Sequence, residues 1–163
     1  MTGKEAIRTA LQSTQQLLGM YLGDMSDQDL LVRPVPNANH IGWQVGHLIA
    51  SEQEMVKILP DARFPELPAG FADQHKPTNA GIEPPKGFAT KAQYLDLFNK
   101  TRAATLAALD KMTDADLDRP TTGKMAQWAP TLGAILLLTA NHTMMHAGQF
   151  TVVRRKLGKP VIF

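Results

Sequence analysis

The chain has 163 residues, of which 44% are hydrophobic and 20% charged, and its 17 basic and 15 acidic residues leave a net charge of +2. This length and composition fit one compact globular domain and exclude wholesale disorder. The small charge surplus gives no reason to expect nucleic acid as a partner. Cysteine is absent, which excludes disulfide frameworks, thiolate zinc sites, iron–sulfur clusters and a cysteine nucleophile.

The sequence predicts neither a membrane span nor a secretion signal. The longest apolar run, residues 132–138, is far shorter than the roughly 20 residues that a spanning helix needs. Residues 1–6 lack the apolar region of a signal peptide. We therefore expect a cytoplasmic protein that does not enter a membrane.

Four segments have the periodicity of amphipathic helices, and no segment has the pattern of a strand. The first helix is predicted at about 3–25 and opens with a capping box between Thr2 and Glu5. The second is predicted at about 40–59, with Asn39 as its N-cap and Pro60 as its stop.

The third and fourth helices have equally clear boundaries. The third, at about 91–112, begins after Thr90, whose hydroxyl forms a capping box with Gln93. The fourth, at about 131–157, begins near Thr131 and ends before Gly158, which suits the left-handed position after a helix.

A long connection separates the second helix from the third. It contains six prolines, at positions 60, 65, 68, 77, 84 and 85. Antiparallel neighbours need only a short loop, so a connection of this length predicts a crossover that returns along the bundle. We expect residues 1–163 to form a single all-α domain, a four-helix bundle of up-down-down-up topology.

The chain also resembles itself at an offset of 87 residues. Residues 25–30 (MSDQDL) match residues 112–117 (MTDADL), and in both places an Arg-Pro pair follows. This similarity predicts two helical hairpins related by a pseudo-twofold axis. His47 has no histidine counterpart in the second half, where Ala134 occupies the matching position.

Three of the five histidines have a spacing suited to metal binding. His142 and His146 are four residues apart in the fourth predicted helix, so both rings leave the same, core-facing side. His47 lies on a stripe of the second helix that could face them. Three imidazoles with an open fourth position are typical of a catalytic zinc-type site. The alternative is that all three are hydrogen-bonded core residues.

Two sequence motifs around these histidines resemble those of a known family. Residues 40–48 (HIGWQVGHL), with Glu52 after them, and residues 141–149 (NHTMMHAGQ) resemble the two motifs of the DinB-like (YfiT-like) superfamily. The resemblance implies an up-down-down-up four-helix bundle, generally a homodimer, that holds a divalent metal. It implies that His47, His142 and His146 are the metal ligands.

The resemblance leaves the reaction open. Relatives that use low-molecular-weight thiols suggest a thiol-dependent S-transferase acting on a small molecule, in which the reacting group would be a thiol on the metal. The alternatives are a metal-dependent hydrolase, in which it would be a water, and a non-catalytic metal-binding stress-response module. Imidazole ligands suit several divalent ions, with zinc and nickel foremost, then iron, manganese and copper.

Other polar residues near these motifs receive weaker assignments. Glu54 and Gln149 are the candidates for holding the ligand rings, His40 is expected to be a capping or surface residue, and His75 is expected to be solvated.

The remaining residues of interest are assigned to packing or capping. Trp43, Trp128, Met144 and Met145 are expected to pack in the core. The basic cluster Arg154, Arg155, Lys156 and Lys159 suits a helix C-terminus, with an anchor for an anionic thiol as the alternative.

Overall fold

The computed structural model describes residues 1–83 and 85–162, and within these residues the structure is helical, with no β-strand. Its elements in chain order are α1 (Gly3–Leu22), η1 (Asp29–Leu31), α2 (Ile41–Val56), α3 (Phe71–Gln74), η2 (Pro77–Asn79), α4 (Lys91–Asp110), α5 (Asp114–Leu117), η3 (Gly123–Gln127) and α6 (Leu132–Lys156). None of these helices is both long and apolar enough to cross a bilayer.

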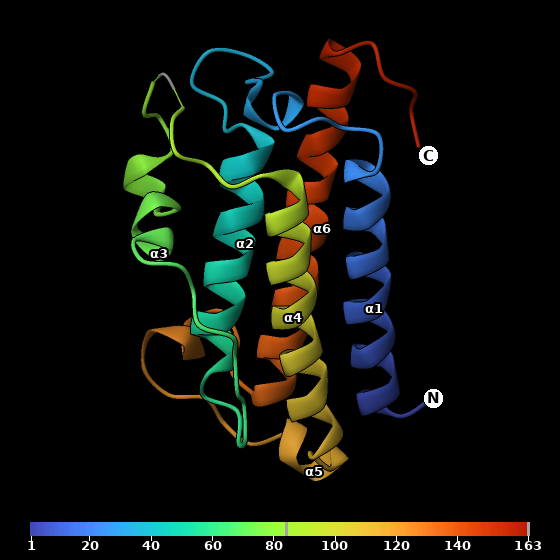
Figure 1. The fold of residues 1–163 in the computed structure, drawn as a ribbon. Coiled ribbons are helices and arrows are strands. Elements are labelled where there is room, and N and C mark those ends of the chain that lie inside the picture. The colour runs from blue at the N-terminus through green and yellow to red at the C-terminus, as the bar shows by residue number, and fades with distance from the viewer. Residues whose placement is uncertain (84, 163) are drawn as a thin grey trace.

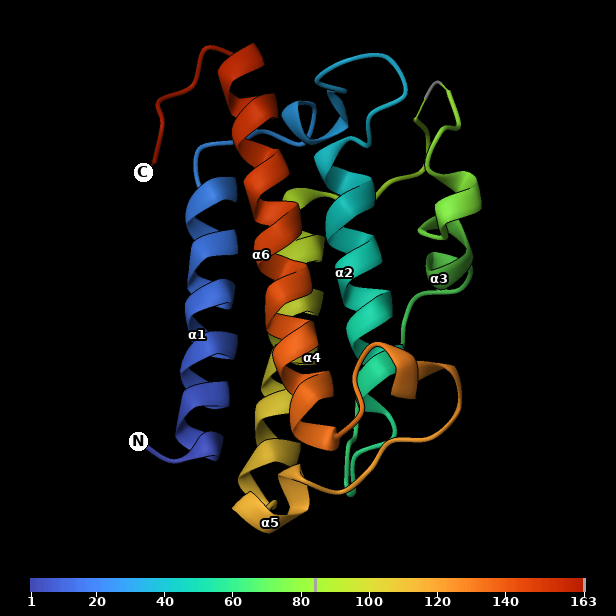
Figure 2. The same cartoon turned by 180° about the vertical axis from the view of Figure 1, so that it is seen from behind.

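The four long helices form a bundle with the predicted topology. α1 runs up from the N-terminus, α2 and α4 both run down, and α6 runs back up (Figures 1 and 2). α1 packs against α6 and α4, and α2 packs against the same two helices. The crossover carries α3 along the outside of α2 before it reaches the start of α4 (Figure 1). The predicted fold class is therefore confirmed.

The long helices end earlier than predicted at three of their C-termini. α1 ends at Leu22 rather than near residue 25, α2 at Val56 rather than 59, and α4 at Asp110 rather than 112. In each case the chain continues as a tight turn, as in the bond from the Leu59 N–H to the Val56 carbonyl. Pro60 disfavours the helical conformation at the residue before it, which explains why α2 stops short.

The predicted caps agree with the structure except at one helix. Thr2 and Thr90 form the expected capping boxes, and Gly158 has a positive φ of 69° after α6. At α2, however, the N-cap is His40 and not Asn39: the His40 Nδ1 accepts the backbone N–H of Trp43 at 3.1 Å.

The two halves of the chain hold each other through reciprocal contacts. In the first, a carboxylate oxygen of Asp27 accepts the backbone N–H of Lys91 at 2.7 Å. In the second, Asp114, which lies 87 residues after Asp27, accepts the backbone N–H of Lys4 at 2.9 Å. Lys91 in turn lies 87 residues after Lys4, so each contact is the counterpart of the other under the repeat. A pseudo-twofold arrangement of helical hairpins predicts this reciprocity.

The hydrophobic core has two apolar layers with a charged layer between them. One layer lies around Leu48 and Phe98, and the other around Leu109 and Ile135. Between them the Arg102 guanidinium is wholly buried and forms two bonds to the Glu52 carboxylate, at 2.9 Å each, from Nε and Nη2. The same guanidinium donates to one group on α1 and one on α6, namely the Leu11 carbonyl and the Thr143 hydroxyl. One side chain thus joins all four long helices.

Candidate metal centre

The structure brings the three predicted histidines together. His47 comes from α2 and His142 and His146 from α6, and one ring nitrogen of each lies within 4.8 Å of those of the other two. The Nε2 atoms of His142 and His146 are 3.2 Å apart. Two nitrogens on a tetrahedral ion with bonds of about 2.0–2.1 Å would be about 3.3 Å apart. The donor set and its spacing therefore fit a divalent metal.

The His146 ring is fixed by a side chain that the sequence interpretation missed. Its Nδ1–H donates to Gln44 Oε1 at 2.8 Å, and the Gln44 amide is itself held by a bond from its Nε2 to the Asn39 carbonyl. With the proton at Nδ1, the Nε2 lone pair of His146 faces His142. Gln44 lies three residues before His47, so helix periodicity places the two on one face of α2, and that spacing was the available signal.

The His47 ring is fixed by the crossover. Its Nδ1–H donates to the backbone carbonyl of His75 at 3.2 Å, which leaves Nε2 free to act as a ligand. On its other side the ring stacks on Trp43, with centroids 4.8 Å apart and planes 8° apart. The hydroxyl of Ser51 lies 3.5 Å from Nε2. Sequence periodicity gave no indication of the carbonyl, because the crossover is irregular.

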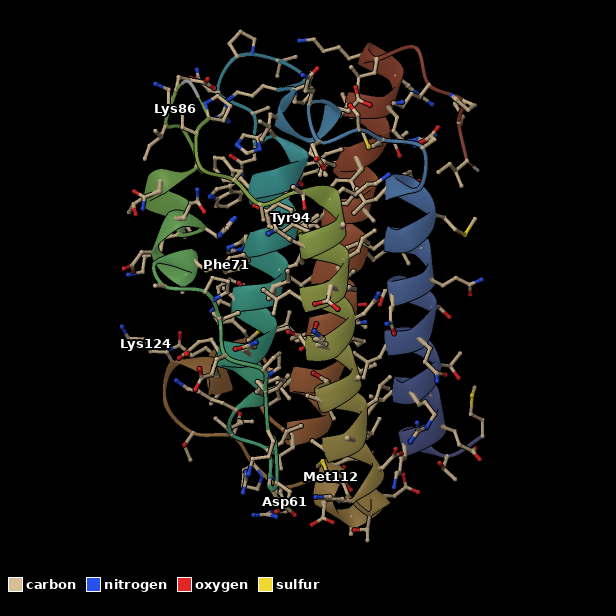
Figure 3. The ribbon with its side chains drawn as sticks, in the orientation of Figure 1. Asp61, Phe71, Lys86, Tyr94, Met112 and Lys124 are labelled. Carbon is tan, nitrogen blue, oxygen red and sulfur yellow. The ribbon has the colours of Figure 1, made fainter. Side chains whose placement is uncertain are left out.

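His75 is buried, contrary to the prediction that it is solvated. Its Nδ1–H donates to the Phe71 carbonyl at 2.7 Å, and its Nε2 accepts the hydroxyl of Tyr94 at 2.8 Å. Figure 3 labels Phe71 and Tyr94, which lie on the crossover and on α4 respectively. The ring also lies against Gly46: a Cβ at that position would be 2.1 Å from His75 Nε2. Gly46 is therefore the residue that lets the crossover approach α2.

Burial keeps all three candidate ligands neutral. Desolvation lowers the pKa of His142 to about 4 and that of His146 to about 3, and it also lowers the pKa of His47. Repulsion from His47 lowers the pKa of His142 further, and repulsion from His142 and His47 does the same for His146. Since a metal binds the deprotonated imidazole, these rings are ready to act as ligands at neutral pH.

Several weaker assignments are corrected by the structure. Glu54 and Gln149 are exposed, and Glu54 pairs with Lys57 at 2.7 Å, so neither holds a ligand ring. Trp43 is buried as expected, but Trp128 is 80% exposed, and Met144 and Met145 are also exposed. Trp128 was assigned to packing because its place in the second half matches that of Trp43 in the first, and the two methionines were assigned to the core from their residue type; the structure corrects all three. His40 is a cap, as expected, and is buried rather than at the surface.

The basic cluster lies at the C-terminal end of α6, where three of its side chains bond to the segment that follows α1. Arg154 is buried and pairs with Asp24, while Lys156 donates to the Arg33 carbonyl and Lys159 to the Asp24 carbonyl. These three cations are therefore engaged within the molecule, which favours a structural role at the helix C-terminus over an anchor for an anionic thiol.

A cavity of about 620 Å³ opens directly beside the histidines. His47 and His142 lie in its wall, together with residues of α2, the crossover and the segment around η3. His146 lies behind them and is only 5% exposed. A ligand entering this cavity would therefore reach the side of the cluster formed by His47 and His142.

Comparison with known proteins gives a family and a fold. The model of the DinB superfamily matches residues 10–150. A conserved protein from Enterococcus faecalis has a TM-score of 0.72 at 18% identity, over 98% of this chain and 99% of that one. YfiT from Bacillus subtilis, described as a probable metal-dependent hydrolase with an unusual four-helix bundle topology, has a TM-score of 0.68 at 17% identity, over 96% of this chain and 89% of that one.

A search of curated proteins found no match. The two structural likenesses, both below 25% identity, concern the fold alone. The family match covers well over half of the sequence, both histidine motifs included. On that ground the chain belongs to the DinB superfamily.

Proposed function

We propose that this protein is a metal-dependent enzyme in which His47, His142 and His146 hold one divalent ion. The observation that carries the proposal is the convergence of three neutral imidazoles on the wall of an open cavity. A closed structural site would not need a cavity of this size beside it. Zinc and nickel suit three imidazoles best among the expected ions, followed by iron and manganese.

The chain's own residues have defined parts in this proposal. A bound divalent ion supplies Lewis acidity, which lowers the pKa of a water or thiol at its open position. Gln44 and the His75 carbonyl hold the Nδ1 protons of His146 and His47, so that their Nε2 atoms are directed toward the ion. Trp43 fixes the plane of the His47 ring by stacking.

Of the expected reactions, hydrolysis has the better support. YfiT, a structural neighbour, is described as a probable metal-dependent hydrolase. Thiol cofactors such as glutathione carry carboxylates, which a cation inside the cavity would bind. Among the described residues of the cavity wall the lysine is Lys76, and it extends into solvent and pairs with Asp73, so it offers little support for binding such a cofactor. The thiol-dependent S-transferase stays a prediction from the family resemblance.

One experiment tests the proposal and separates the two reactions. Tag-free protein is stripped with a chelator, reloaded with zinc or nickel, and assayed on neutral 4-nitrophenyl esters and on glutathione with an aryl halide. We expect ester hydrolysis that requires the metal and is lost in the His142→Ala variant. Turnover that is unchanged by metal removal would contradict the proposal, while turnover that requires the added thiol would favour the transferase.

We further propose that the protein acts as a cytoplasmic homodimer. Support for the dimer comes from apolar side chains on the outer face of α1 and α6, where Met20, Met144 and Val152 are exposed. A hollow of about 730 Å³ lies among α1 and α6 residues on this face. An isologous dimer would cover it in both copies. Light scattering tests this: we expect the parent protein to be a dimer and the Met144→Lys variant to be a monomer. A monomeric parent would contradict the proposal.

A further inference from the structure

The cavity beside the histidines is lined mainly by apolar side chains. Those that carry the argument are Ala50 and Met55 of α2, Pro77 of the crossover, Met125 and Trp128 of the η3 segment, and Leu138 of α6. Its volume of about 620 Å³ is in the range that accommodates a small organic ligand. In Figure 3 the η3 segment, marked by Lys124, and α3, marked by Phe71, lie on the same side of α2.

The charged residues of the wall are turned to solvent. Glu54 pairs with Lys57 and Lys76 pairs with Asp73, each within its own segment, and all four side chains are more than half exposed. The polar groups that face the interior belong to the histidines and to Ser51, beside His47 Nε2. Within the part of the chain that the structure describes, the wall therefore offers no buried charge to recognise a charged substrate.

Trp128 is the unusual residue of this wall. It is 80% exposed, although tryptophan is the largest apolar side chain, and it follows a turn fixed by bonds from the Trp128 and Ala129 N–H groups to the Met125 carbonyl. A segment that presents Trp128 to water beside a cavity is stabilised when a ligand covers the exposed ring, and the half-buried Met125 lies next to it in the wall. An exposed aromatic ring at the edge of an apolar cavity is typical of a ligand-binding groove.

We propose that the cavity is an apolar subsite that binds an uncharged alkyl or aryl group of the substrate, while a metal-binding head group lies at the histidines. The inference rests on the proposed metal site and adds the chemical class of the substrate. It implies that substrates with longer uncharged tails bind more tightly, and that a charge at the end of the tail removes the gain.

The test uses n-alkyl hydroxamates from acetohydroxamic to octanohydroxamic acid, titrated calorimetrically into the zinc-loaded protein. A fully buried methylene corresponds to about fourfold in affinity, and partial burial should leave at least about twofold per methylene. We expect the affinity to rise with tail length until the cavity is filled. Hydroxamates with a terminal carboxylate or ammonium group should bind no more tightly than acetohydroxamate.

Trp128 provides a second readout, because the chain has 2 tryptophans. In a Trp43→Phe background, which keeps an aromatic ring against His47, the tryptophan fluorescence comes from Trp128 alone, and octanohydroxamate should shift it to shorter wavelength. The Trp128→Ala variant should lose several-fold more affinity for octanohydroxamate than for acetohydroxamate. A spectrum that does not change while the long hydroxamate binds would overturn the role of Trp128 and of the subsite.

A placed charge gives the matched control. Ala72 lies in the cavity wall and is exposed, so Ala72→Glu should weaken octanohydroxamate several-fold and strengthen the ammonium-tailed analogue. Ala103 is exposed on α4 outside the cavity, and Ala103→Glu should change neither.

The failures can be told apart. If zinc binds and acetohydroxamate requires it, but affinity does not depend on the tail, the subsite is wrong and the metal site stands. If no hydroxamate binding depends on zinc, both the subsite and the proposed function are wrong.

Discussion

At the scale of residues, the candidate centre depends on where two protons are held. A ligand imidazole must present an unprotonated nitrogen, and the hydrogen bond at the other nitrogen decides which one that is. Gln44 provides that bond for His146, and the backbone carbonyl of His75 provides it for His47. Of these two partners, Gln44 can be changed by substitution without moving the backbone.

Replacing Gln44 should weaken metal binding while the three ligands stay in place. We expect Gln44→Ala to lower the affinity for zinc about 10–100-fold, because the Nδ1–H of His146 loses its acceptor. Gln44→Glu keeps an acceptor at this position and should retain most of the affinity. Competition with a chromophoric chelator measures both, and equal affinities for the parent and Gln44→Ala would show that the bond plays no part.

His40 should make the metal-free protein sensitive to acid. Burial lowers the pKa of His40 to about 4, against about 6.5 in an unfolded chain. Between these values the unfolded state binds a proton that the folded state does not, so stability falls as the pH is lowered from 6.5 toward 4. Above pH 6.5 His40 is neutral in both states and adds no pH dependence to the free energy of unfolding.

The control is His40→Asn, which can cap α2 but does not titrate. Guanidinium unfolding at pH 7.5, 6 and 5 should give a stability slope that is shallower in the variant by up to about 1.4 kcal/mol per pH unit. Identical slopes would mean that His40 is protonated equally in both states.

Some site residues were predictable from the sequence and others were not, for physical reasons. The helical period alone places His142 and His146 on one face, and the same period would have indicated Gln44 beside His47. The role of the His75 carbonyl had no such signal, since an irregular crossover has no period from which its path could be read. Arg102 lies one turn after Phe98 on the buried face of α4. Its burial could not be predicted from the sequence, because a charged residue is expected to be exposed unless its partner, here Glu52, is known.

At the scale of elements, the crossover is part of the site rather than a simple connection. Its carbonyl at His75 holds His47, and its residues 72 and 75–77 form a wall of the cavity. The length of the crossover predicted the topology of the bundle. Its hydrogen bond to His47, however, depends on its close approach to α2 at Gly46. A side chain at Gly46 should separate the two elements.

Gly46→Ala should destabilise the protein by about 1–3 kcal/mol, because the new Cβ would overlap the His75 ring. Gly19→Ala in α1 is the matched control: apart from the neighbouring backbone of α1 itself, no atom lies within 4 Å of its Cβ position, and the substitution should stabilise the helix by about 0.5–1 kcal/mol. Urea unfolding measures both. In a His75→Ala background, which removes the ring, the cost of Gly46→Ala should largely disappear; an unchanged cost would assign it to another contact.

At the scale of the whole molecule, the charged layer fixes how the four helices are placed. Arg102 and Glu52 are both almost fully buried, and Thr143, which contacts Arg102, is next to His142 in the chain. The register of α6 against α2, and with it the distance between the histidines, is therefore coupled to this ion pair. Apolar layers alone would not specify that register.

Removing one charge of the pair should cost more than removing both. We expect Glu52→Leu to destabilise the protein by about 3–5 kcal/mol, because it leaves the Arg102 charge buried without its partner. The double variant Glu52→Leu with Arg102→Met should recover most of that loss. Guanidinium unfolding of the parent, of Glu52→Leu, of Arg102→Met and of the double variant measures this. A double variant whose loss of stability equals the sum of the two single losses would contradict this account.

The bundle as a whole was predictable because its caps, helical periods and crossover length all lead to the same topology. The surface was less so: Trp128, Met144 and Met145 are exposed although their residue types favour the core. Residue type predicts burial only on average, because apolar atoms also make up much of the surface of a folded protein.

The most direct test of the central claim is the metal content of tag-free protein purified without added metal. It is measured by elemental analysis beside the variants His146→Ala and Gln149→Ala, the latter an exposed residue on the same helix. We predict one equivalent of a divalent metal in the parent and in Gln149→Ala, and its loss in His146→Ala. A parent that holds no metal, even after zinc, nickel and manganese have been offered, would contradict the three-histidine centre.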